Sequence, residues 1–165
     1  MINPSPMKRF LTLCVSLVSF ALFGQTLPYT SITNIQYVSP SNLAACNDTS
    51  AYLGDTVMTY GIVVTPGDVS EVASGSVQGG HRPFFFLVDT VAQGAAGSFR
   101  GMECMGVYTN AQGQLLPLPN VEYLLPGDLV KFTGRVGAYN NGTQLEAIDG
   151  NSLQVIGSRP VPTPF

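Results

Sequence analysis

The sequence is poor in the residues that most enzymes use for chemistry. It contains no tryptophan, one histidine and three cysteines, and only 10% of its 165 residues are charged. The single histidine, His81, stands in a glycine-rich stretch, where a surface position is expected. No His or Cys cluster has the spacing of a metal site, and no glycine-rich loop carries the lysine of a phosphate-binding loop. We therefore expect no catalytic residue, no cofactor and no metal, and a protein that is not an enzyme.

Four acidic residues are the one candidate calcium site in the sequence. Asp48, Asp55, Asp68 and Glu71 lie in one part of the sequence. They lack the spaced oxygen ligands of a known calcium loop, whereas aspartates commonly cap turns. We favour the turn-capping interpretation.

The N-terminus has the layout of a secretory signal peptide. Lys8 and Arg9 precede an apolar run from Phe10 to Phe23, which Gly24 and Gln25 follow. This run is shorter than the roughly 20 residues that a membrane-spanning helix needs. We therefore expect residues 1–25 to be removed and the protein to be secreted, to the extracellular space or the cell surface. Export leaves five of the seven basic residues against ten acidic ones, a formal net charge of −5.

One strand pattern occurs twice. "GDTVMTYGIV" at residues 54–63 and "GDLVKFTGRV" at residues 127–136 share their Gly-Asp entry, their alternation and an inward-facing glycine. Alternation of period two predicts strands. Gly61 and Gly134 would weaken a flat strand but suit one that bends sharply or is closely approached. Two bent strands are what a small closed barrel needs, so we expect these two to be neighbours.

The remaining pattern completes an all-β domain over residues 31–157. We expect strands at Pro83–Asp89, Gly101–Thr109, Thr143–Ile148 and Ser152–Gly157, an extra N-terminal strand at 31–38, and an ordered loop with at most one helical turn at 110–126. Asn141-Gly142 signals a tight hairpin. Five core strands with a long connection between the third and fourth predict an OB-fold-like five-stranded Greek-key barrel. Residues 158–165 have the composition of a Pro-rich linker, with a frayed terminus as the alternative.

The repeated strands, "FFLVD" and "NNGTQL" resemble a family of extracellular bacterial OB-fold domains. These domains occur in secreted multidomain proteins, often beside endonuclease/exonuclease/phosphatase domains or type IX secretion sorting domains. The resemblance covers roughly residues 31–156, and Val88 stands where the family often has Gln. It implies an uncharacterised binding or spacer module of a larger exported protein. Two function classes stay open: that module, or the accessory nucleic-acid-binding domain of a secreted nuclease or phosphatase.

Ligand-binding candidates are the aromatic and cationic residues expected on outer strand faces: Tyr60, Phe85, Tyr108, Lys131 and Arg135. Stacking aromatics and cations bind single-stranded nucleic acid. The negative charge of the domain opposes a polyanion, so nucleic acid is possible but not favoured. We favour other domains of the full-length protein, or a cell-surface or extracellular ligand, as partners. Lys131 and Arg135 equally suit a strand that they only keep soluble.

Two kinds of covalent site are expected. Cys46 and Cys104 remain after signal cleavage, and export favours a disulfide between them; burial of Cys104 in its strand is the alternative. Thr56 and Thr90 stand in Asp-Thr-Val tripeptides that resemble a bacterial O-glycosylation motif. Motifs of three residues also occur by chance, and Thr90, just past a strand, is the better acceptor.

Export is directly testable. The full-length chain, expressed in a secreting bacterium, should leave the cytoplasm with a new N-terminus near Gly24 or Gln25, which intact mass spectrometry measures. Leu17→Arg puts a charge into the apolar run and should block export. A secreted protein that retains residues 1–25 would contradict the signal peptide.

Overall fold

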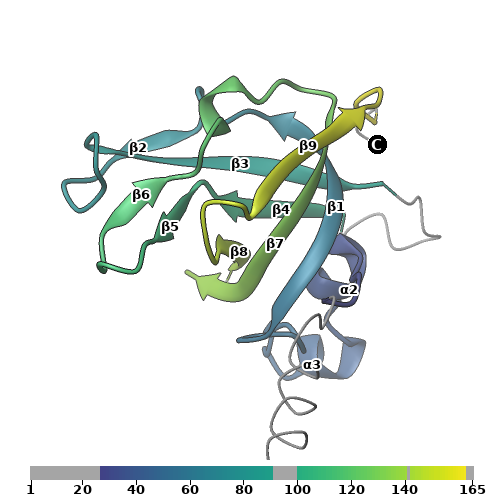
Figure 1. Ribbon diagram of the computed structural model, residues 1–165. Helices are drawn as coiled ribbons and strands as arrows, with labels where there is room; N and C mark the ends of the chain where they lie inside the picture. The colour runs from purple at the N-terminus through teal and green to yellow at the C-terminus, as the bar shows by residue number, and fades with distance from the viewer. Residues whose placement is uncertain (1–26, 91–99, 141, 163–165) are drawn as a thin grey trace, which may run out of the picture.

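The computed structural model describes residues 27–90, 100–140 and 142–162, and within them strands predominate (Figure 1). The expected signal peptide lies outside these residues. The strands are β1 (Thr56–Thr65), β2 (Glu71–Ala73), β3 (His81–Asp89), β4 (Gly101–Met105), β5 (Val107–Thr109), β6 (Leu115–Pro117), β7 (Asp128–Tyr139), β8 (Gly142–Ala147) and β9 (Leu153–Ser158). The helical elements are α2 (Ile32–Gln36), α3 (Pro40–Ala44) and the 3₁₀ turn η3 (Val121–Tyr123).

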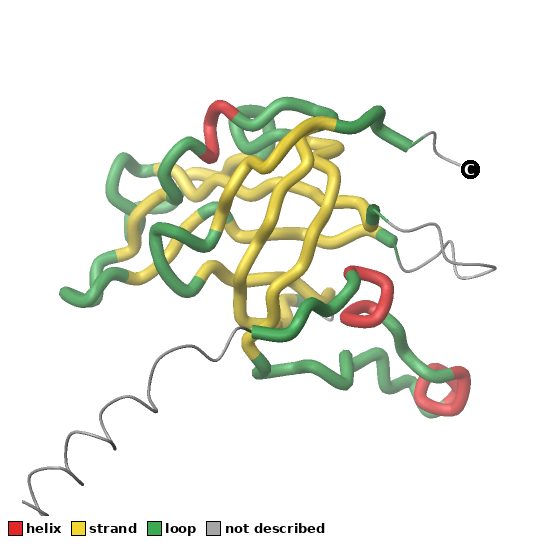
Figure 2. Tube along the Cα trace, turned by 45° about the vertical axis from the view of Figure 1, so that its right-hand side comes forward, coloured by secondary structure: helices red, strands yellow, loops and turns green. Residues whose placement is uncertain are grey.

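Five of these strands close into a barrel. The sheet order is β1-β3-β4-β8-β7, and β7 pairs back onto β1. The neighbours are antiparallel except β4 and β8, which are parallel. This order and the one parallel pair make the barrel an OB-fold, so the predicted fold class is confirmed. β9 extends the sheet beside β7, and the wrapped sheet is clearest in Figure 2.

The two repeated strands are neighbours, as predicted. Their register runs without a break from Thr56 opposite Arg135 to Ile62 opposite Leu129. The expected inward residues of both strands are buried. Ile62 was expected to face solvent and is buried as well. It lies between apolar cross-strand neighbours, Val88 on β3 and Leu129 on β7, and directly opposed residues share a face of the sheet.

The inward glycines of the repeat stand where the interior has no room for a side chain. A Cβ on Gly61 would lie 2.8 Å from the Cβ of Leu87 and 3.0 Å from the Cδ1 of Ile32. A Cβ on Gly134 would lie 2.7 Å from the ring of Phe132 and 2.8 Å from the carbonyl oxygen of Glu146. Close approach of neighbouring groups therefore accounts for both glycines.

Both ends of the barrel are plugged by short segments. Ile32 and Ile35 of α2, both 0% exposed, belong to the core at one end. At the other end, the segment around η3 contributes three buried residues, Leu118, Val121 and Leu124. Figure 2 shows α2 and η3 at opposite ends of the sheet. None of the helices among the described residues is long and apolar enough to cross a membrane.

The extra N-terminal strand predicted at 31–38 is wrong, because this segment forms α2. The side chain of Ser31 caps the helix by accepting from Asn34 N at 3.2 Å. The Asp89 carboxylate, at the end of β3, accepts from Thr33 N at 2.9 Å and from Thr33 Oγ1 at 2.8 Å. β-branched residues favour a strand locally, but a helix places Ile32 and Ile35 on one face, where both enter the core. Tyr29, which precedes this segment, makes an isolated β-bridge to Met58.

Smaller differences concern turns and short strands. The β7–β8 hairpin is confirmed, but Tyr139 pairs with Gly142, so Gly142 belongs to β8 rather than to the loop. Asn140 takes the left-handed conformation, with φ of 48°, which asparagine tolerates well. Residue 141 lies outside the described residues. The expected strand 101–109 is broken at Gly106 into β4 and β5, and β6 pairs with β5 inside the expected loop.

Crowding at Gly61 predicts a selective loss of stability. Gly61→Ala forces a methyl group against Leu87 and Ile32, and such overpacking costs about 1–3 kcal/mol of unfolding free energy. Gly101→Ala is the matched control, because that strand glycine has no such neighbour within 4 Å; its change should stay within about 0.5 kcal/mol. Equal effects of both substitutions in urea unfolding would contradict this account.

Candidate functional site

The outer face of β3 forms the centre of the site. Burial alternates along this strand, so Pro83, Phe85 and Leu87 face the core while Arg82, Phe84 and Phe86 are half-buried on the outside. The rings of Phe84 and Phe86 meet edge to face, with centroids 5.9 Å apart. This pair of outward phenyl groups is an aromatic surface that sequence reasoning missed.

Phe85, which was predicted to bind a ligand, is instead a core residue. It is 0% exposed, and its ring packs edge to face on Phe132 at 5.6 Å. The prediction is wrong by one residue along the strand, and a shift of one residue moves a side chain to the opposite face of the sheet. The run "PFFFLV" is apolar on both faces, so its sequence pattern does not show which phenylalanines point inward.

Neighbouring strands extend the outer face in register. Phe86 lies opposite Glu103 of β4, and Glu103 lies opposite Gln144 of β8. In the next row, Phe84 lies opposite Met105, and Met105 opposite Glu146. Side chains of directly opposed residues point to the same face. Two rows of aromatic, carboxylate and amide groups therefore cross β3, β4 and β8.

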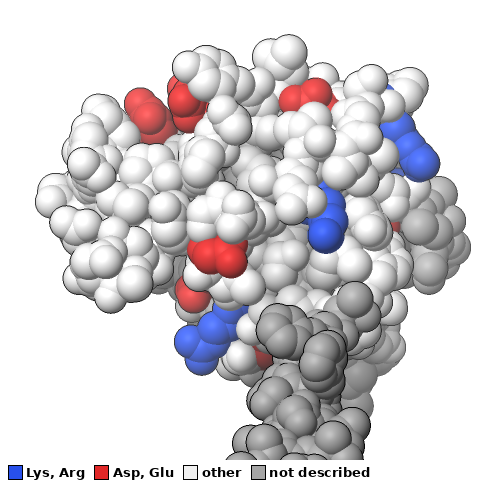
Figure 3. All heavy atoms as spheres, viewed as in Figure 1, with Lys and Arg blue, Asp and Glu red and all other residues white. Residues whose placement is uncertain are grey.

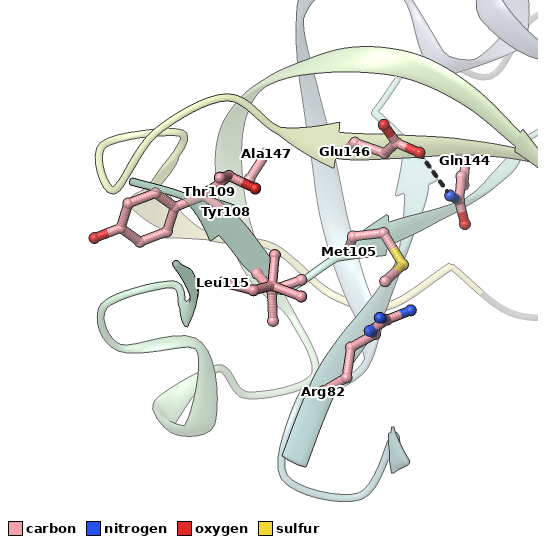
Figure 4. Close-up of a pocket in the computed structure, with 9 residues that line it drawn as sticks. Arg82, Met105, Tyr108, Thr109, Leu115, Gln144, Glu146 and Ala147 are labelled. Atoms are coloured by element: carbon pink, nitrogen blue, oxygen red, sulfur yellow. Dashed lines mark hydrogen bonds between the residues drawn. The ribbon is translucent and has the colours of Figure 1, made fainter. Parts of the chain in front are cut away.

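Three adjoining pockets lie along these rows and together form the outer groove. The central pocket, of about 290 Å³, is lined by Val72, Arg82, Phe84, Glu103, Met105, Tyr139 and Gln144. A second pocket of about 220 Å³ shares Arg82, Met105 and Gln144 with it and continues to the β5–β6 hairpin (Figure 4). A third, of about 380 Å³, shares Glu103 and continues to the α2–α3 segment. Tyr139, 67% exposed at the end of β7, stands over the central pocket.

At least one polar atom of the outer groove has no hydrogen-bond partner within the described residues. The Nε atom of Arg82 is buried and has no hydrogen-bond partner within the described part of the chain. Gln144 Nε2 donates to Glu146 Oε1 at 3.0 Å, which holds the two side chains beside one another (Figure 4). His81 Nδ1 lies 3.5 Å from Glu71 Oε1, and this contact involves neither Arg82 nor Glu103. The charged lining residues are one arginine against Glu103, Glu146 and Asp48, a formal charge of −2.

Of the predicted ligand residues, Tyr108 lines the outer groove. It is half-buried and borders the second pocket with Leu115 and Ala147. The phenol lies against Gly150, where a Cβ would meet the Tyr108 hydroxyl at 3.2 Å. Tyr108 thus forms part of the wall between the groove and the β8–β9 connection.

Tyr60 and Lys131 lie together, but away from the outer groove. They are directly opposed on β1 and β7, and Lys131 is also paired with Gln154 of β9. The Tyr60 ring packs on Tyr29 at 5.4 Å. Burial and the nearby Asp89 carboxylate raise the pKa of Tyr29.

Arg135 is separated from Lys131 and forms no basic patch with it. It lies opposite Glu146 on β8, and its Nε donates to the Gly54 carbonyl at 3.3 Å. Figure 3 shows cations scattered singly over the face of β1, β7 and β9, with acidic groups between them. That arrangement does not form the continuous positive surface that a nucleic acid backbone needs.

The predicted covalent sites are distributed differently than expected. Both cysteines are free in the structure, so the Cys46–Cys104 disulfide is not formed. Cys46 is exposed after α3, whereas Cys104 is 0% exposed in the core and burial raises its pKa. Thr56 is exposed at the start of β1, and Thr90 is half-buried, which makes Thr56 the more accessible of the two. Nothing in the structure tests their modification.

His81 and the four acidic residues considered for a calcium site, Asp48, Asp55, Asp68 and Glu71, are exposed at the surface. The side chain of His81 is 60% exposed and lies 3.5 Å from Glu71. The described residues include no group of three or more His, Cys, Asp or Glu side chains arranged to hold a metal ion.

Comparisons with known proteins bear on the fold alone. No model of a known family matches the chain, and no curated protein matches its sequence. Among solved structures, the chain is similar to the OB domain of Ta0387 from Thermoplasma acidophilum, with 18% identity. The match covers 67% of this chain and 80% of that domain, with a TM-score of 0.33. At this score the likeness adds no argument, and the OB-fold rests on the strand order described above.

The free cysteines predict two very different thiols. In the mature protein, Cys46 should react with a thiol reagent at pH 8 under native conditions. Cys104 should react only after unfolding, because it is buried and a raised pKa keeps it protonated. Cys46→Ser should abolish the native reaction and retain the second. A mature protein in which neither thiol reacts after denaturation without reductant would contradict the free state.

Proposed function

We propose that this chain is a non-enzymatic, exported OB-fold module that binds an extracellular or cell-surface partner in the outer groove. The observation that carries the proposal is that three pockets across β3, β4 and β8 share lining residues, with aromatic and polar side chains between them. Concave, largely apolar surfaces with a few convergent polar groups are the usual form of ligand sites. Export is supported by the sequence of residues 1–25.

A binding role suits the chemistry of the groove better than catalysis. Its two neighbouring carboxylates, Glu103 and Glu146, lie on adjacent strands two residues apart in register. Such a pair resembles the acid and base of a glycosidase in composition. However, Glu146 already accepts from Gln144, and the one histidine lies at the surface, paired with Glu71. We therefore propose binding without turnover.

The accessory nucleic-acid-binding alternative has less support. A phosphate backbone requires several cations, whereas the groove has a formal charge of −2 with Arg82 as its one cation. Neither Lys131 nor Arg135 lines the three pockets, and Arg135 lies opposite Glu146, so a carboxylate stands between it and the groove. Another domain of the same polypeptide remains a partner compatible with the groove.

Co-sedimentation tests the module even while its ligand is unidentified. The mature domain should sediment with the insoluble cell-surface and extracellular fraction of the cells that produce it. Phe84→Ala with Phe86→Ala should reduce the apparent affinity by at least about tenfold, because aromatic anchors carry much of a binding energy. Both side chains are on the outer face, so the thermal midpoint verifies that the variant is folded.

The control is Lys131→Ala, whose cross-strand neighbours Tyr60 and Gln154 do not line the groove, and this variant should sediment like the parent protein. Binding lost in this variant and retained in the phenylalanine variant would place the site on β7 instead. A parent protein that never sediments would count against a surface-binding module. Accumulation of reducing ends or free nucleotides in the same incubation would contradict a non-enzymatic role.

A further inference from the structure

The polar side chains of the outer groove combine hydrogen-bond donors and acceptors within one short surface. Arg82 presents only donors, whereas Glu103 presents only acceptors when ionised. Arg82 and Glu103 both line the central pocket without forming an ion pair with each other. Arg82 is half-buried, and its Nε has no hydrogen-bond partner within the described residues. A ligand that bonds to both side chains has to accept from Arg82 and donate to Glu103.

Most charged ligands meet only half of this requirement. A phosphodiester accepts from Arg82 but has no proton to donate to Glu103, and it would face the negative charge of the groove. An ammonium group donates to Glu103 but cannot accept from the guanidinium. A hydroxyl group does both, because it has one donor and two acceptor positions. The groove thus favours a ligand that carries many neutral hydroxyl groups.

The apolar part of the outer groove fits the same ligand class. Phe84 and Phe86 offer ring surfaces between the polar rows, and Tyr139 offers an exposed ring over the central pocket. Sugar rings have apolar C–H faces and polar hydroxyl edges, so a saccharide can pack on a phenyl group while its edges reach Arg82 and Glu103. The three pockets, which share lining residues, provide room for more than one sugar unit.

We propose that the outer groove binds a neutral polysaccharide chain across β3, β4 and β8, with the hydroxyl groups held between Arg82 and Glu103. This proposal rests on the proposed function and names the chemical class of its ligand. Neutral hydroxyl recognition has one clear consequence: the affinity depends on both charged side chains, but only weakly on salt, because the ligand itself carries no charge.

Affinity electrophoresis tests the ligand class with defined probes. Gels containing hydroxyethylcellulose, arabinoxylan, glucomannan, laminarin or soluble starch should include at least one that retards the mature domain. Titration with the matching oligosaccharide should then give affinities at 50 and 500 mM NaCl that agree within about twofold. Single-stranded oligo-dT and an oligolysine peptide should not bind. Retardation by none of the polysaccharides would overturn the proposal.

Two substitutions distinguish hydroxyl recognition from simple charge attraction. Arg82→Met and Glu103→Met each remove the polar atoms while keeping an aliphatic stem, and each should weaken binding by about tenfold or more. Arg159→Met and Glu122→Met are matched controls outside the groove and should bind normally. A ligand lost only with Arg82 would be an anion, and one lost only with Glu103 a cation. Either result would overturn the proposal.

Co-sedimentation separates failure of the ligand class from failure of the module. If the phenylalanine variant loses sedimentation but no neutral polysaccharide binds, the groove is still the site and the glycan assignment is wrong. If the parent protein binds neither the insoluble fraction nor any polysaccharide, both proposals fail. If the polysaccharide that retards the domain in the gel also prevents its sedimentation, the two assays measure the same binding site.

Discussion

Closure of the sheet between β1 and β7 is the constraint on which the remaining structure depends. Seven consecutive residue pairs join these strands, from Thr56 with Arg135 to Ile62 with Leu129. A sheet of five strands closes only if its strands bend strongly, and each of these two carries an inward glycine with no room for a Cβ. Closure then decides which face of each intervening strand is buried, and therefore which face of β3 forms the groove.

The groove itself is a consequence of how the barrel is completed at its ends. α2 plugs one end, and the α2–α3 segment borders the third pocket through Gln36, Val38 and Leu43. The β5–β6 hairpin, at the other side of the groove, borders the second pocket. Segments that lie outside the five-stranded core therefore give the outer face its walls. Without the α2–α3 segment, Phe86 would lie on an open surface.

Buried polar contacts hold one of these walls in place. Asp89, 1% exposed at the end of β3, accepts two hydrogen bonds from Thr33 at the start of α2. Hydrogen bonds to a charged acceptor contribute more than neutral ones, about 1.5–3 kcal/mol. A carboxylate at the first turn of a helix also occupies the end where the backbone N–H groups are unpaired. The helix is therefore positioned by a residue 56 places away in sequence.

The sequence by itself determined the β-character of the domain, the pairing of the two repeated strands and the β7–β8 hairpin, because period-two alternation and turn residues are local signals. It did not determine the secondary structure of residues 31–38. There, β-branched residues favoured a strand locally, but contacts with a distant carboxylate and with the end of the barrel selected a helix. Nor did it determine which phenylalanines of "PFFFLV" face outward, since a strand that is apolar on both faces carries no parity signal. That parity, and hence the groove, was decided only when closure of the barrel between β1 and β7 placed one face of β3 against the core, where Phe85 packs on Phe132.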